Sequence, residues 1–138
     1  MFGCRNVAMR TCKHEDMNII SVLSQKGGAG KTTLVVHLAV AASLDGKSTA
    51  VIDLDAQANA AEWGDSRDLD EPAVTSAQAA RLPKILEAAK DAEADLVIID
   101  TPARSESTAL AAAKCADLVL IPCRPSVFDL QAIRMTAD

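Results

Sequence analysis

Short runs of aliphatic residues alternate along the chain with longer, helix-like segments. Four runs are apolar over most of their length, without regular alternation, and rich in β-branched residues, at 19–24, 49–53, 96–100 and 118–122. The segments between them that have helical character lie at 31–45, 82–93 and 105–115. Strands that are apolar at every position are typical of a parallel sheet covered by helices on both faces. The pattern therefore predicts an α/β fold with a mainly parallel sheet between two helical layers.

The N-terminal segment does not follow this pattern. Residues 1–16 are polar, mixed in charge and aperiodic, so we expect a disordered extension. Met17 comes directly before the first apolar run and is a candidate start of the protein. We therefore expect one folded domain, residues 17–138, behind an N-terminal extension.

Two further segments are less regular. Residues 56–80 combine small residues with a charged stretch at 65–71, which predicts a loop with a weak strand near Val74. A last helical stretch is predicted after Pro125. In the helix at 31–45, His37 is expected to pack as a neutral histidine. In the segment 56–80, Trp63 is expected to be a packing residue.

Composition and charge exclude several classes of function. The 138 residues suit one domain, and 49% hydrophobic with 24% charged residues is a globular composition. Only 2% of residues are aromatic, which disfavours a base-stacking surface for nucleic acid, and the net charge of −5 gives no general attraction to DNA or anionic lipid. No apolar run approaches the roughly 20 residues of a membrane span. Four cysteines without a CxxC pair fit free thiols in a reducing cytoplasm.

The strongest chemical signal is Lys-Gly-Gly-Ala-Gly-Lys-Thr-Thr at 26–33, between the first apolar run and the first helix. Glycines let backbone N–H groups converge on an anion, and a helix N-terminus adds donors and partial positive charge. Lys31 can reach the β- and γ-phosphates of a nucleotide, and the Thr32 hydroxyl can ligate Mg²⁺. The plain P-loop pattern requires glycine where Gln25 stands, so the sequence departs from it there. The predicted phosphate site comprises Gly27, Gly28, Ala29, Gly30, Lys31, Thr32 and Thr33.

Aspartates end two of the apolar runs. Asp53 and Asp55 lie two residues apart, so we expect their side chains to share one face, and Asp100 ends the most apolar run. Ligands of α/β sheets bind at the carboxyl ends of the strands, where carboxylates can hold Mg²⁺. The alternative for Asp53 and Asp55 is that they only cap a turn.

Three motifs in this order resemble the ParA/MinD family of deviant Walker A P-loop ATPases: KGGAGKTT at 26–33, DLDAQANA at 53–60 and LVIIDTPA at 96–103. IPCRPSVFDL at 121–130 is a softer match. The resemblance extends over about residues 17–138, and the short plasmid or chromosome partition ATPases of the ParA type fit best. It implies a three-layer P-loop NTPase fold with ATP and Mg²⁺ as cofactors. The strand order that it implies is 48–53, 95–100, 19–24, 117–122.

The resemblance also implies roles for single residues. Lys26 matches the family's signature lysine, which reaches the partner's phosphates in a nucleotide-sandwich dimer. Asp55 matches the residue that orients the attacking water, although the family often has proline where Ala56 stands. The implied catalytic residues are Lys26, Lys31 and Asp55, and the implied Mg²⁺ site consists of Thr32, Asp53 and Asp100, with Asp100 at the Walker B position.

The implied function is an ATPase that forms an ATP-dependent homodimer and drives plasmid or chromosome partition with a centromere-binding partner. It would be cytoplasmic and associated with the nucleoid. One alternative is a MinD-like positioning ATPase at the membrane, and another is a nucleotide-binding fragment that does not hydrolyse. Family members usually continue beyond this endpoint with the segments that contact the base and non-specific DNA. We therefore expect a C-terminally truncated chain that self-associates without ATP and discriminates weakly between ATP and GTP.

Overall fold

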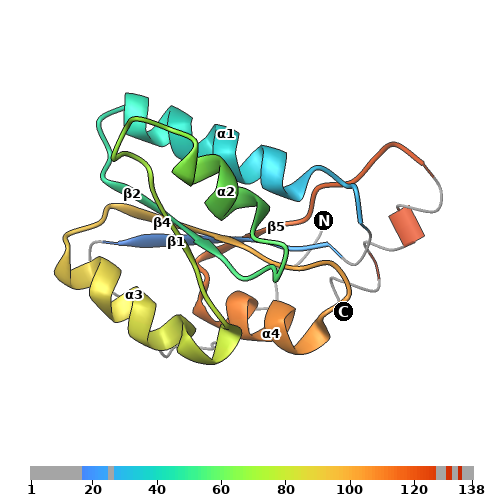
Figure 1. Ribbon diagram of the computed structural model, residues 1–138. Helices are drawn as coiled ribbons and strands as arrows, with labels where there is room; N and C mark the ends of the chain where they lie inside the picture. Colours follow the sequence, from blue (N-terminus) through green and yellow to red (C-terminus); the bar gives the residue numbers. More distant parts are fainter. Residues whose placement is uncertain (1–16, 25–26, 127–129, 132–133, 135–138) are drawn as a thin grey trace, which may run out of the picture.

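Five parallel strands form a single sheet in the order β3-β2-β4-β1-β5 (Figure 1). The computed structural model describes residues 17–24, 27–126, 130–131 and 134 of the chain. The strands are β1 (Asn18–Val22), β2 (Thr49–Asp53), β3 (Ala73–Ser76), β4 (Leu96–Asp100) and β5 (Leu118–Leu120). All four pairings are parallel. The predicted sheet and strand order are confirmed, and the weak strand predicted near Val74 is the edge strand β3.

The helices cover both faces of the sheet, which confirms the three-layer architecture. One face carries α1 (Lys31–Leu44) and α2 (Asn59–Asp65), and the other carries α3 (Leu82–Asp91) and α4 (Glu106–Cys115), as Figure 1 shows. A short 3₁₀ turn at Ala79–Arg81 leads into α3. Because all strands are parallel, their carboxyl ends lie at one edge of the sheet, and the loops that follow them gather there.

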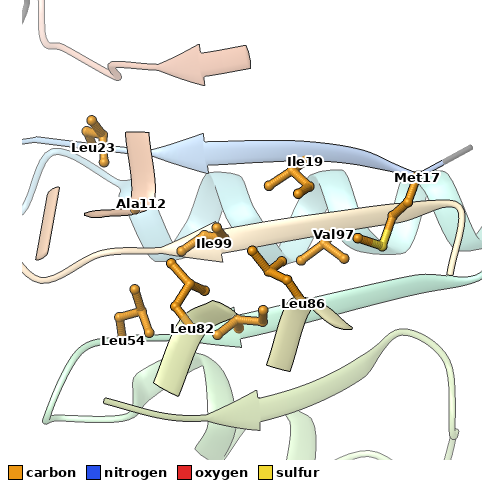
Figure 2. Packing of buried hydrophobic residues seen from close by; sticks show 10 residues of the cluster. Met17, Ile19, Leu23, Leu54, Leu82, Leu86, Val97, Ile99 and Ala112 are labelled. Atoms are coloured by element: carbon orange, nitrogen blue, oxygen red, sulfur yellow. The ribbon is translucent and has the colours of Figure 1, made fainter. Parts of the chain in front are cut away.

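The layer between the sheet and α3–α4 is aliphatic and tightly packed. Figure 2 shows Leu82 and Leu86 of α3 against Val97 and Ile99 of β4. Ile19 belongs to the same cluster, as does Met17 just before β1, which is 5% exposed. Successive strand residues point to opposite faces, so Val97 and Ile99 meet α3 while Ile98 faces α1. Because the strands are apolar on both faces, this alternation places aliphatic side chains in both layers between the sheet and the helices.

The opposite layer is built around one stripe of α1. Lys31, Val35 and Ala39 are its buried residues, spaced four apart, which places them on one side of the helix. Leu34 and Leu38 beside this stripe are partly buried against the same core cluster, whereas Leu44 at the end of the helix is 85% exposed. The expectation of a packed His37 was wrong: its side chain is exposed, with Nδ1 2.7 Å from the Thr33 carbonyl oxygen.

The sequence did not predict the helix α2, which lies within the segment 56–80 that was expected to form a loop with a weak strand. It is only seven residues long and has no side-chain cap of its own at its first turn. It packs closely on β3: a Cβ added at Gly64 would lie 2.7 Å from the Cβ of Val74. Trp63 is half-buried, and the Arg67 guanidinium lies over its ring, 4.7 Å from the centroid.

The last strand is shorter than predicted, since β5 ends at Leu120 rather than at Pro122. As the edge strand it leaves Leu118 51% and Val119 37% exposed. The extension predicted at 1–16 lies outside the described residues, as does most of the helical stretch predicted after Pro125.

Candidate nucleotide-binding site

The glycine loop joins β1 to α1 at the carboxyl edge of the sheet. Gly28 has a φ of 73° and Gly30 a φ of 82°, values that side-chain-bearing residues rarely adopt. Gly30 is also the N-terminal flanking residue of α1, and no side chain caps the helix there. The first hydrogen bond of the helix runs from the Leu34 N–H to the Gly30 carbonyl oxygen, so the preceding N–H groups have no partner within α1. The loop therefore presents backbone donors at the positive end of a helix.

Thr32 and Asp100 meet below this loop. The Thr32 hydroxyl donates a hydrogen bond of 2.7 Å to Oδ2 of Asp100, which ends β4. Asp100 is 1% exposed, and its Oδ1 is buried with no hydrogen-bond partner among the described residues. A hydroxyl next to an unpartnered carboxylate oxygen suits a hard cation such as Mg²⁺. The Thr32–Asp100 pair therefore has the oxygen atoms, one of them without a partner, that a Mg²⁺ site needs.

The protonation of Asp100 reflects its burial. The pKa of its carboxyl is raised from 3.8 to about 6, and loss of solvation is the largest cause. Within this balance, the hydrogen bond from Thr32 lowers the pKa, the charge of Asp53 raises it, and the charge of Lys31 lowers it. Lys31 itself is only 8% exposed, so the site holds a buried lysine whose charge acts on the buried Asp100 carboxylate. A bound polyphosphate and cation would supply opposite charges to both kinds of group.

Asp53 is fully buried, and backbone N–H groups occupy both of its carboxylate oxygens. Oδ1 accepts from Asp55 at 3.0 Å, and Oδ2 accepts from Ala60 at 2.9 Å and Ala61 at 3.2 Å. Ala60 and Ala61 lie in the first turn of α2, so Asp53 closes β2 and caps α2 from a distance. The carboxylate also lies opposite Asp100 in the pairing of β2 with β4. A role of Asp53 beside Mg²⁺ stays a prediction, whereas its cap role is visible.

Asp55 lies beyond the end of β2, in the loop that leads to α2. It is half-buried, and its Oδ1 accepts a hydrogen bond of 3.0 Å from the Gln57 N–H. The residue lines an open cavity of about 610 Å³ at the carboxyl ends of β2 and β3. The residues lining it are Leu54, Asp55, Ala56, Ser76, Ala77, Gln78 and Arg81. The cavity gives solvent and ligands access to the Asp55 loop.

The predicted site residues that the structure describes, all but Lys26, gather at one edge of the sheet. The described ones are Gly27, Gly28, Ala29, Gly30, Lys31, Thr32, Thr33, Asp53, Asp55 and Asp100. Lys26 lies outside the described residues, so its predicted reach to a partner's phosphates remains a prediction. Sequence reasoning missed Arg81, in the Asp55 cavity, and Arg124, whose Nη2 donates a hydrogen bond to the Gly28 carbonyl oxygen. The match of 121–130 to the family was the only signal near Arg124.

The fold and this site define a P-loop nucleotide-binding domain with a deviant Walker A loop. The family model of the CobQ/CobB/MinD/ParA nucleotide binding domain matches residues 20–136, and the chain belongs to this family.

Curated relatives agree with this assignment, and a solved structure agrees with the fold. The chain is 34% identical over 117 residues to the maintenance of carboxysome distribution protein A of Gloeobacter kilaueensis, covering 83% of this chain and 53% of that protein. It is 30% identical over 128 residues to Protein ParA of Rhizobium radiobacter, covering 88% and 57%. The septum site-determining protein MinD of Pyrococcus horikoshii OT3, solved with Mg-ADP, superposes with a TM-score of 0.71 at 22% identity, over 88% of this chain and 65% of that one.

The chain spans about half the length of the curated relatives it matches. Within the part of the chain that the structure describes, no helix combines the length and apolarity that crossing a bilayer requires.

Proposed function

We propose that the chain binds Mg-ATP in the glycine loop and hydrolyses it slowly. The observation that carries this proposal is the Thr32–Asp100 pair with its unpartnered buried oxygen, next to buried Lys31 and the loop of Gly28 and Gly30. A triphosphate needs backbone donors, a positive side chain and a bound cation. The loop offers the donors, Lys31 the positive charge, and Thr32 with Asp100 the ligands for the cation.

Each predicted residue then has a part. The N–H groups of residues 28–33 receive the phosphates, and the Lys31 ammonium neutralises their charge. The Thr32 hydroxyl and the Asp100 carboxylate would hold Mg²⁺, with Asp53 close by. The bound ion would supply positive charge to offset the charge that develops on the transferred phosphoryl group. Asp55 orients the attacking water from the rim of the cavity, and Lys26 acts across an ATP-dependent homodimer.

At the level of biology, we propose a partition or positioning ATPase of the ParA type that works with a centromere-binding partner in the cytoplasm, on the nucleoid. The relatives named for ParA and for carboxysome distribution favour this role. A MinD-like role at a membrane is the second candidate, favoured by the likeness to the Mg-ADP structure of MinD. The third is a nucleotide-binding fragment without turnover.

Calorimetric titration of the chain with ATP and ADP, with and without Mg²⁺, tests the binding. We expect Mg²⁺-dependent affinity for both nucleotides and little for AMP, since the donors address the β- and γ-phosphates. Phosphate release and light scattering with Mg-ATP then separate a dimeric ATPase from a monomeric fragment without turnover. Equal affinity for ATP and AMP would overturn the proposal.

A further inference from the structure

The segment after β5 reaches back to the glycine loop through one arginine. Arg124 lies 96 residues from Gly28 in sequence, and its Nη2 donates a hydrogen bond to the Gly28 carbonyl oxygen. The two segments lie side by side because β5 pairs with β1 and the Leu23 N–H bonds the Leu120 carbonyl oxygen at 2.9 Å. In Figure 1 the start of α1 and the chain leaving β5 lie at the same end of the sheet.

This contact fixes the direction of one peptide unit. In a trans peptide the C=O of one residue and the N–H of the next point to opposite sides. A guanidinium that holds the Gly28 oxygen therefore turns the Ala29 N–H away from Arg124. Gly28, with φ at 73°, belongs to the residues most free to rotate this unit, so an external hold matters here.

We propose that Arg124 is a positioning residue for phosphate binding, which holds the Gly28–Ala29 peptide so that the Ala29 N–H is presented to a polyphosphate. This inference rests on the proposed function of the glycine loop as the phosphate site. The guanidinium also carries a permanent positive charge to the loop, which an amide side chain could not supply.

The space around Gly28 fits this role. A Cβ at residue 28 would lie 3.2 Å from Nη2 of Arg124, closer than ordinary contact, and would meet an unfavourable φ. A side chain at residue 28 would thus displace the guanidinium from the carbonyl oxygen. Glycine at residue 28 therefore permits the turn and also leaves room for the Arg124 guanidinium at the carbonyl oxygen.

Three variants test the hydrogen bond. Arg124→Met removes the donors and the charge but keeps an unbranched side chain, Arg124→Lys keeps a donor and the charge, and Lys90→Gln removes one positive charge at the far end of α3. Lys90 is exposed and lies toward the amino ends of the strands, so it is the matched control. Amide hydrogen exchange is measured at residues 28–31 with and without saturating tripolyphosphate. Affinity is measured for Mg-ADP and for inorganic tripolyphosphate.

We expect Arg124→Met to reduce the protection that saturating tripolyphosphate gives the Ala29 N–H, and to weaken tripolyphosphate and Mg-ADP binding about tenfold, the size of a hydrogen bond to a charged group. Arg124→Lys should restore most of the affinity, and Lys90→Gln should change neither measurement. Unchanged protection of Ala29 together with affinity equal to wild type would overturn the inference. So would faster exchange across all strands, because Arg124 would then only support the fold.

Binding by the wild-type chain separates this inference from the proposed function. If the wild-type chain binds neither probe, the proposed function fails, and Arg124 has no phosphate to position. If wild type binds both and the Arg124 variants bind equally well, only the inference about Arg124 fails.

Discussion

The Thr32 hydroxyl donates a hydrogen bond of 2.7 Å to Oδ2 of Asp100, and this bond joins the first turn of α1 to the end of β4. One side chain follows the glycine loop and the other ends the most apolar strand, so the contact links two motifs 68 residues apart. The second oxygen of the carboxylate remains buried without a partner among the described residues. The arrangement leaves one ligand position of the carboxylate available to a cation.

Replacing Thr32 by valine should remove the Mg²⁺ dependence of nucleotide binding. Valine keeps the shape but offers neither the hydroxyl ligand nor the hydrogen bond to Asp100. Titration of ADP with and without Mg²⁺ measures the effect, and Thr32→Ser, which keeps the hydroxyl, is the control. A valine variant that still gains affinity from Mg²⁺ as wild type does would contradict the metal role.

Lys31→Ala should weaken Mg-ATP binding by about 2–4 kcal/mol, because the phosphate charge loses its buried positive partner. The shift corresponds to roughly 30- to 700-fold in the dissociation constant. Lys90→Ala, at an exposed position far from the loop, should bind like wild type. If Lys31→Ala retains wild-type affinity by calorimetry, the phosphate site lies elsewhere.

Asp55→Ala should separate binding from turnover. A carboxylate that orients water acts mainly in the transition state, so kcat should fall while ATP affinity stays close to wild type. Phosphate release under saturating Mg-ATP measures the first quantity and calorimetry the second. A catalytically competent wild type and an equally active Asp55→Ala variant would remove Asp55 from the mechanism.

Asp53→Asn should lower the free energy of unfolding by about 1–2 kcal/mol, because an amide caps α2 less well than a carboxylate that accepts three N–H groups. Urea denaturation measures this loss. Asp65→Asn, at the exposed last position of the same helix, should cost little. A variant of unchanged stability but weakened Mg²⁺ affinity would instead favour the metal role of Asp53.

The nucleotide-free chain should lose stability as the pH rises through the pKa of Asp100. The folded chain keeps that proton up to about pH 6, whereas the unfolded chain releases it near 3.8, so protons favour folding between these values. Between about pH 4.5 and about pH 7.5 the carboxyl should cost roughly 2 kcal/mol. Urea denaturation of Asp100→Asn should show this part of the pH dependence removed; equal profiles for the two proteins would disprove the shift.

The predictions from the sequence agree with the structure wherever an apolar run is long or several motif residues lie close together in the chain. The apolar strands, their order and the position of 26–33 between strand and helix were predictable, since the apolar periodicity and family motifs carry that information. The helix α2 was not, because it is short and its cap, Asp53, lies six residues before its first residue. The contact of Arg124 with Gly28 was also hidden, since nothing local in either segment requires the other.

The short helix α2 is fixed at both of its ends, which restricts how the length of this region can change in evolution. The Asp53 carboxylate holds its first turn, and Gly64 faces Val74 with no space for a side chain. One residue inserted between these two points would rotate the end of α2 by about 100°, since a helix has 3.6 residues per turn. A Cβ would then replace the hydrogen of Gly64 against β3. Insertions and deletions should therefore be rare between residues 53 and 64 and more common in the exposed loop at 68–70, which comes before Glu71 accepts a hydrogen bond of 3.1 Å from the Thr49 N–H.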